Sequence, residues 1–161
     1  MIVLKNILVA TDFSEPSDVA LAYGRDLARS YDSTLHVLHV VEDINLRYSP
    51  EVGIGTADLQ RDLESRARGQ LDAIITDDDR RTLKIVPCVE TRLSVPSGIT
   101  DYAARHRIDL IIAGTHGRGP FTKLIMGSVA ERVVRTAPCP VLTVREHERE
   151  FIAPDALTTT T

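Results

Sequence analysis

The residues best suited to binding an anion gather in one stretch, residues 114–128. Glycines stand at positions 114, 117 and 127 and Ser128 follows, which gives the frame G-x-x-G, nine residues, G-S. Glycine lets backbone N–H groups turn toward an anion with no Cβ in the way. Gly127 and Ser128 open a predicted helix, whose free N–H groups and positive dipole end favour phosphate. The Ser128 hydroxyl and the Arg118 guanidinium add further donors, so the pattern indicates a phosphate-binding loop.

The same residues also fit a purely structural role. Gly114 would then be a turn at the end of a strand and Ser128 a helix N-cap. The run from Ser128 to Glu131 matches the S-x-x-E capping box. Because a serine hydroxyl both donates and accepts, capping and phosphate binding are compatible. The residues of this loop alone leave both interpretations open.

Alternating apolar runs and helical patterns predict the elements that hold this loop. Short runs rich in Val, Ile and Leu predict strands at 6–10, 34–41, 83–90, 109–113 and 141–145. Apolar residues at helical spacing predict helices over 19–28, 57–76, 97–107 and 128–136, and residues 45–56 are predicted to be a loop. In the long helix we expect Leu59, Leu63, Leu71, Ile74 and Ile75 on the inner face. The acidic run 77–79 would be its solvated end.

Strands separated by helices pair in parallel through right-handed crossovers. The sequence therefore predicts an α/β fold: one doubly wound, Rossmann-like, five-stranded parallel sheet with helices on both faces. Residues 1–145 are expected to form one domain, and residues 146–161, which lack periodicity, a disordered tail. The last strand, 141–145, is expected at an edge of the sheet, where unpaired backbone groups invite pairing.

Composition narrows the function. The 161 residues carry 19 basic and 23 acidic side chains, a net charge of −4, which argues against a nucleic-acid surface. Aromatic residues make up 4%, too few for base-stacking platforms. The apolar runs are far too short to span a membrane, and the N-terminus does not resemble a signal peptide. The expected location is the cytoplasm.

Other chemistry finds little support. Cys88 and Cys139 are far apart and are expected to be buried thiols, so no protein metal site is predicted. His36 and His39 stand three apart on a strand, which places them on opposite faces as packed, hydrogen-bonded histidines. The chain has no G-x-x-x-x-G-K-[ST] motif and no recognisable Ser/His/Asp set.

Several segments together resemble the ATP-binding type of the universal stress protein family. The frame from Gly114 to Ser128 matches the family's ATP-binding signature G-2x-G-9x-G-S. The similarity continues through residues 129–134 and 137–142, and it includes the opening 7–14 and the strand 38–41. It thus extends over nearly the whole chain, to about Arg145.

This resemblance implies an adenine nucleotide alpha hydrolase-like fold with the first and fourth strands side by side. Ligands of such sheets bind at the carboxyl ends of the strands there. Asp12 would hydrogen-bond the adenosine part and Val40 would pack on the adenine, with Ala113 nearby. Gly117, Gly127, Ser128 and Val129 would hold the phosphates. Asp12 is the one carboxylate expected near the nucleotide, so ATP hydrolysis would be slow at most. The full predicted set is Ala10, Thr11, Asp12, Val40, Ala113, Gly114, His116, Gly117, Arg118, Gly127, Ser128, Val129 and Ala130.

The resemblance also implies ATP accompanied by Mg²⁺, a regulatory role in a stress response, and a homodimer. The dimer would form by pairing the last strand with its copy, through Val141, Leu142, Thr143, Val144 and Arg145. A second hypothesis remains open, an ATP-independent protein-interaction module, because some relatives lack the motif. A protein partner is expected in either case, and its identity does not follow from the residues.

Overall fold

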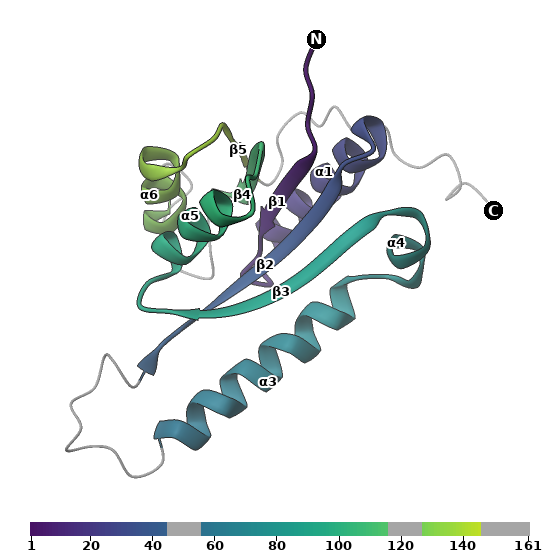
Figure 1. The fold of residues 1–161 in the computed structure, drawn as a ribbon. Helices are drawn as coiled ribbons and strands as arrows, with labels where there is room; N and C mark the ends of the chain where they lie inside the picture. The colour runs from purple at the N-terminus through teal and green to yellow at the C-terminus, as the bar shows by residue number, and fades with distance from the viewer. Residues whose placement is uncertain (45–55, 116–126, 146–161) are drawn as a thin grey trace.

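The computed structural model of the chain describes residues 1–44, 56–115 and 127–145 (Figure 1). Its strands are β1 (Asn6–Ala10), β2 (Thr34–Glu42), β3 (Lys84–Arg92), β4 (Leu110–Gly114) and β5 (Val141–Val144). Its helices are α1 (Glu15–Tyr31), α3 (Thr56–Ile74), α4 (Asp77–Thr82), α5 (Val95–Arg105) and α6 (Ser128–Thr136). All strands pair in parallel in the order β3-β2-β1-β4-β5, which confirms the predicted fold class.

The sheet is covered on both faces. Strand β1 lies at its centre, and Ile7, Leu8 and Val9 have no exposed surface, as expected of a strand buried on both sides. Ile7 and Val9 pack with α1 and the end of α3, whereas Leu8 packs with α5 and α6. Figure 1 shows α5 and α6 on one side of the sheet and α1 and α3 on the other. These two sides are called the α1 face and the α5 face below.

Helix α1 lies unusually close to the sheet at Gly24. A Cβ at this position would collide with Val9 and would lie 3.1 Å from Leu35 Cδ1. Glycine is therefore required for the close contact between the helix and the strands.

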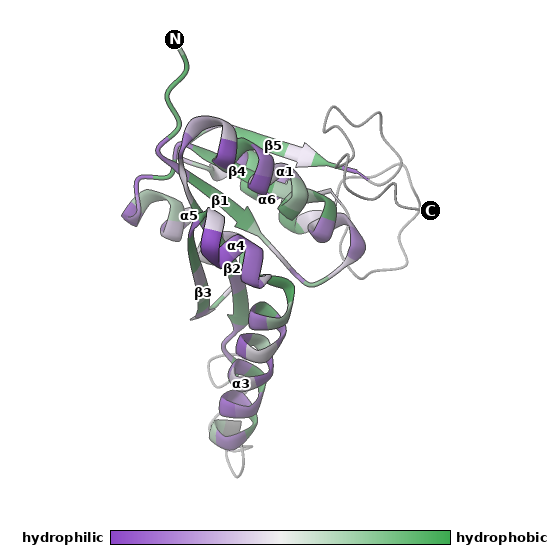
Figure 2. Ribbon diagram, turned by 90° about the vertical axis from the view of Figure 1, so that its right-hand side faces the viewer, coloured by the Kyte–Doolittle hydropathy of each residue, from purple (hydrophilic) through white to green (hydrophobic). Residues whose placement is uncertain are grey.

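The predicted long helix and its acidic end differ from the structure. Helix α3 ends at Ile74, and residues 77–82 form a separate short helix, α4. Leu59, expected on the inner face, is 53% exposed and lies in the first turns of α3, which project beyond the strands (Figure 2). Its neighbour Gln60 takes the inner position instead: it is 7% exposed and accepts a hydrogen bond from the Ile44 N–H at 3.1 Å. Further along the inner face, Ala67 and Leu71 are buried.

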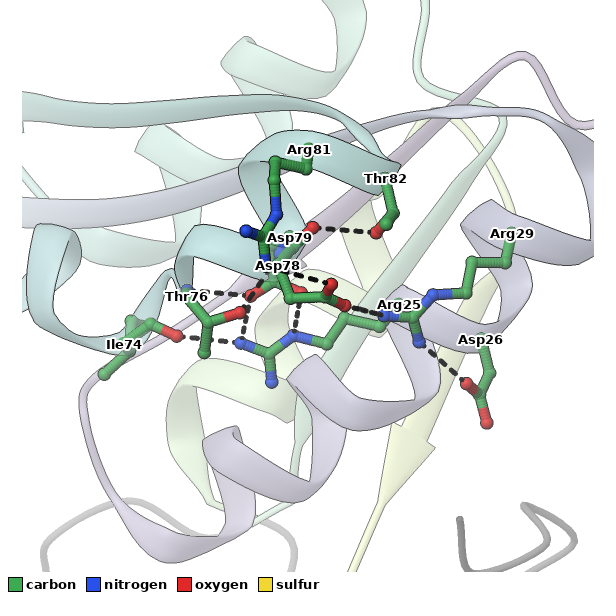
Figure 3. Close-up of polar contacts among 9 residues, drawn as sticks. All are labelled: Arg25, Asp26, Arg29, Ile74, Thr76, Asp78, Asp79, Arg81 and Thr82. Carbon is green, nitrogen blue, oxygen red and sulfur yellow. Dashed lines mark hydrogen bonds and ion pairs between the residues drawn. The ribbon is translucent and has the colours of Figure 1, made fainter. Parts of the chain in front are cut away.

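Asp79 in α4 contradicts the prediction of a solvated acidic run. Its side chain is 2% exposed and accepts two hydrogen bonds from Arg25 of α1, at 2.9 and 2.7 Å (Figure 3). Asp79 also forms a capping box with Thr76, and Arg25 donates to the Ile74 carbonyl at 2.8 Å. The acidic run therefore fastens the end of α3 and all of α4 to α1, while Asp78 remains on the surface.

A second polar cluster lies on the α5 face. His36 Nδ1 lies 2.9 Å from the Tyr102 hydroxyl, and the His106 ring stacks on Tyr102. Burial lowers the pKa of His36, with a further contribution from His106, and burial raises the pKa of Tyr102 and of Cys88. All three buried groups therefore favour their neutral forms. Cys88 and Cys139 are half-buried free thiols, less enclosed than expected.

Candidate nucleotide-binding site

The carboxyl ends of three neighbouring strands frame the candidate site. Ala10 of β1 pairs with Ala113 of β4 on one side and with Leu38 of β2 on the other. Ala10 packs against the apolar cluster on the α5 face, and Val40 belongs to that cluster. Ala113 lies two residues after Ile111 of the same cluster, so strand alternation places it on this face too. Three predicted site residues thus come together at the switch point of the sheet.

Asp12 lies in a tightly hydrogen-bonded turn between β1 and α1. Its Oδ1 accepts from the Ser14 N–H at 3.1 Å and from the Ser14 hydroxyl. This is an Asx-turn, which fixes the carboxylate at the end of β1. Among the described residues, Oδ2 has no hydrogen-bond partner. One oxygen therefore holds the turn and the other is available to a ligand.

Thr11 has a structural role in the same turn. Its side chain is buried; the hydroxyl lies 3.0 Å from Ser17 Oγ and accepts from the Phe13 N–H at 3.0 Å. Its backbone N–H donates to the Leu38 carbonyl at 2.9 Å, which extends the pairing of β1 with β2. Any contact of Thr11 with a ligand would thus involve atoms other than its hydroxyl.

The residues that flank the predicted phosphate loop on either side lie next to each other. Gly114 ends β4, and a Cβ there would lie 2.8 Å from Pro16 Cβ in α1, so glycine is needed for the close approach. The Thr115 N–H donates to Val144 of β5, and the Thr115 carbonyl accepts from the Gly127 N–H at 2.6 Å. The two ends of the loop are therefore joined beside β4. His116, Gly117 and Arg118 lie outside the described residues.

Helix α6 begins without a side-chain cap, which corrects the capping-box expectation. Gly127 is the N-cap and Ser128 is the first helical residue, so the Ser128 hydroxyl is not in the capping position. The Glu131 N–H makes the first intrahelical bond, to the Gly127 carbonyl. The N–H groups of Ser128, Val129 and Ala130 have no acceptor among the described residues. Such groups at a helix N-terminus are the donors that an anion satisfies.

Val40 has little surface left for an adenine. It is 6% exposed, because α5 covers it at Gly98, where a Cβ would lie 2.8 Å from Val40 Cγ1.

At the far edge of the sheet, the predicted dimer strand is confirmed as an edge strand, but it ends at Val144 rather than Arg145. The described residues contain no cluster of three or more His, Cys, Asp or Glu side chains able to hold a metal ion.

Two residues beside the candidate site, Phe13 and His39, are not in the predicted set. Phe13 adopts a positive φ of 62°, which its side chain gives no reason to expect. His39 is packed and hydrogen-bonded, as predicted: its ring stacks on Phe13 with centroids 4.4 Å apart, and its Nδ1 lies 2.8 Å from the Thr11 carbonyl oxygen. Its place beside the Asp12 turn was not predicted. The only available signal was the position of His39 next to Val40.

Comparison with known proteins agrees with this parallel α/β fold. The model of the universal stress protein family matches residues 4–145. A curated universal stress protein of Methanocaldococcus jannaschii is 30% identical over 151 residues, covering 91% of this chain and 85% of the relative. A curated universal stress protein A homolog of Coxiella burnetii is 34% identical over 143 residues, covering 87% and 95%. The chain belongs to the universal stress protein family.

Solved structures show the same fold. The universal stress protein UspA of Lactobacillus plantarum superposes with a TM-score of 0.73 at 25% identity, covering 90% of this chain and all of that one. Two more distant universal stress proteins are complexes with adenine nucleotides. The protein of Archaeoglobus fulgidus with dAMP has a TM-score of 0.62 at 20% identity, covering 89% of this chain and 99% of its own. The other, with cAMP, has a TM-score of 0.61 at 18% identity, covering 89% and 98%.

Proposed function

We propose that the protein binds ATP at the carboxyl ends of β1, β2 and β4 and acts as a nucleotide-dependent regulatory module in a stress response. The observation that carries this proposal is the start of α6. Three backbone N–H groups, those of Ser128, Val129 and Ala130, point out of a helix that lacks a side-chain cap. They follow Gly127, whose N–H donates to the Thr115 carbonyl at the end of β4.

The chemistry of these donors fits a phosphate chain. Backbone N–H groups and a helix dipole stabilise negative charge without a cationic side chain, so a net charge of −4 does not oppose binding. Oδ2 of Asp12 would accept from the adenosine part, and the apolar face formed by Ala10, Ala113 and the edge of Val40 would receive the base. The relatives in complex with dAMP and cAMP support an adenine nucleotide as the class of ligand.

Mg²⁺ would enter with the phosphates, since the described residues supply no ligand cluster of their own. Among the described residues, Asp12 is the one carboxylate proposed for the site, and its Oδ1 is occupied by Ser14. Because no second acid or base is proposed among the described residues to position a water molecule, ATP would be held rather than rapidly hydrolysed. In the cell the protein would act in the cytoplasm as a homodimer through β5.

The test is calorimetric titration of ATP into the wild type and into a double variant, Gly127→Val plus Ser128→Leu. Gly127 has φ −59° and ψ 147°, which valine also adopts, so the variant is expected to fold. We expect the affinity to fall at least tenfold as side chains crowd the donors. The matched control is Gly69→Val on α3, where a Cβ meets nothing within 4 Å and binding should be unchanged. Equal affinity in the double variant would refute the proposal.

An ATP-independent interaction module is the alternative, in which the glycine loop is only structural. It is favoured if protein purified without added nucleotide releases no adenine nucleotide on denaturation and gives no heat with ATP. The uncapped N-terminus of α6 argues against it, because a purely structural helix start gains stability from a cap.

A further inference from the structure

The β1–α1 turn that carries Asp12 contains a residue in an unfavourable backbone conformation. Phe13 has φ 62°, in the left-handed region, which is strained for a residue other than glycine. Such a conformation persists only where its surroundings hold it in place. The turn's own hydrogen bonds, from the Phe13 N–H to Thr11 Oγ1 and from the Ser14 N–H to Asp12 Oδ1, account for part of this support.

Phe13 also packs against the apolar cluster on the α1 face, and further support comes from His39 on the neighbouring strand β2. A carbonyl oxygen only accepts hydrogen bonds, so His39 Nδ1, 2.8 Å from the Thr11 carbonyl, must carry the proton and donate it. The His39 ring also stacks on Phe13, with an interplanar angle of 28°. One side chain thus contacts the residues on both sides of Asp12.

We infer that His39 is a positioning residue of the nucleotide site, which holds the Asp12 carboxylate in place for the adenosine part of the ligand. Its neighbour Val40 turns to the opposite face, where its small exposed edge would contribute to the apolar surface for the base. Two consecutive residues of β2 would therefore act on different parts of the nucleoside: His39 on the ribose side through Asp12, and Val40 on the base. This inference rests on the proposed function, since it assigns His39 a role toward the same ligand.

Two substitutions separate the hydrogen bond from the stacking. His39→Asn keeps a donor and loses the ring, because the asparagine amide nitrogen can lie where His39 has Nδ1. His39→Phe keeps a ring against Phe13 and loses the donor. The matched control is His36→Phe, a histidine on the same strand that contacts Tyr102 on the other face.

Calorimetry with ATP and with inorganic tripolyphosphate measures the effect on the ligand. We expect His39→Phe to weaken ATP about tenfold, His39→Asn to stay within about threefold of wild type, and tripolyphosphate to bind all variants equally. In an Asp12→Ala background, His39→Phe should have no further effect on ATP, because its action passes through Asp12. Unchanged ATP affinity in His39→Phe, or an equal loss in the Asp12→Ala background, would overturn the inference.

Amide hydrogen exchange measures the turn without any ligand. His39→Phe should speed exchange at Phe13 and Ser14 about tenfold, whereas His36→Phe should leave these two amides unchanged. A wild type that binds no ATP would refute the proposed function, yet the exchange rates would still decide whether His39 holds the turn. Equal exchange in wild type and His39→Phe would refute the positioning role by itself.

Discussion

At the scale of single residues, the site depends on which polar atoms the fold uses and which it leaves available. Ser14 occupies one oxygen of Asp12, and the Thr115 carbonyl occupies the Gly127 N–H. The N–H groups that remain at the start of α6 lie on residues for which the sequence left a capping box and a phosphate site both open. Because the N-cap is Gly127 and not Ser128, no side chain accepts from the first N–H groups of α6, and these groups remain available as hydrogen-bond donors.

His36 gives a prediction at the same scale. Its Nε2 is buried without a hydrogen-bond partner among the described residues, and burial holds its pKa below the ordinary 6.5. Between the folded pKa and 6.5 the unfolded chain binds more protons, so stability falls as the pH falls through this window. His36→Asn keeps polar atoms near Tyr102 but does not titrate.

Urea unfolding at pH 8 and pH 5.5 measures this dependence. The wild type should lose more stability between the two pH values than His36→Asn does, since His106 and the other ionisable groups remain in both proteins. Each unit of pKa depression contributes about 1.4 kcal/mol to the difference. Parallel losses in the two proteins would show that His36 does not couple folding to pH.

At the scale of elements, long-range polar contacts fasten helices that hydrophobic packing alone leaves weakly attached. Helix α4 has six residues, too few to be stable in isolation, and its attachment is the Asp79–Arg25 pair (Figure 3). Burial raises the pKa of Asp79, but hydrogen bonds from Arg25 and Thr76 outweigh it and leave the pKa below its usual value. The ionised carboxylate therefore stabilises the fold, and this contribution is lost as the pH falls through the lowered pKa.

Asp79→Ala is expected to destabilise the protein by about 3 kcal/mol, because it leaves Arg25 without its partner and removes the capping box. Asp78→Ala is the matched control: its side chain is on the surface, paired at 3.6 Å or more, and should cost less than about 1 kcal/mol. Urea unfolding at pH 7 compares the two. A similar, small loss in both variants would mean that the buried pair does not anchor α4.

At the scale of the whole molecule, the sheet presents two edges, and β5 is the one expected to pair with a second copy. The carbonyls of Pro140 and Val144 accept from the N–H groups of Ile111 and Thr115, so alternation turns the backbone groups of Val141 and Thr143 outward. A second copy would pair with these outward backbone groups of β5. None of the described helices is long and apolar enough to cross a membrane.

Thr143→Pro is expected to convert the predicted dimer into a monomer, because it removes an outward N–H and leaves the bonds to β4 intact. Thr143→Val keeps the N–H and should remain dimeric. Light scattering at tens of micromolar protein distinguishes the two states. A monomeric wild type would refute the dimer, and a dimeric Thr143→Pro would place the interface elsewhere.

The sequence by itself determined the strands, most of the helices and the parallel sheet, because apolar periodicity and the βα alternation are local patterns with few topological solutions. The meeting of Ala10 with Ala113 followed only from the resemblance to the universal stress protein family. Only the tertiary structure decided that Asp79 is buried, that Gly127 caps α6, and that His39 reaches Thr11. Each of these depends on a partner elsewhere in the chain, as with Arg25, which stands 54 residues before Asp79. Local patterns predict elements, whereas the environment of a polar group is set by whatever the fold packs against it.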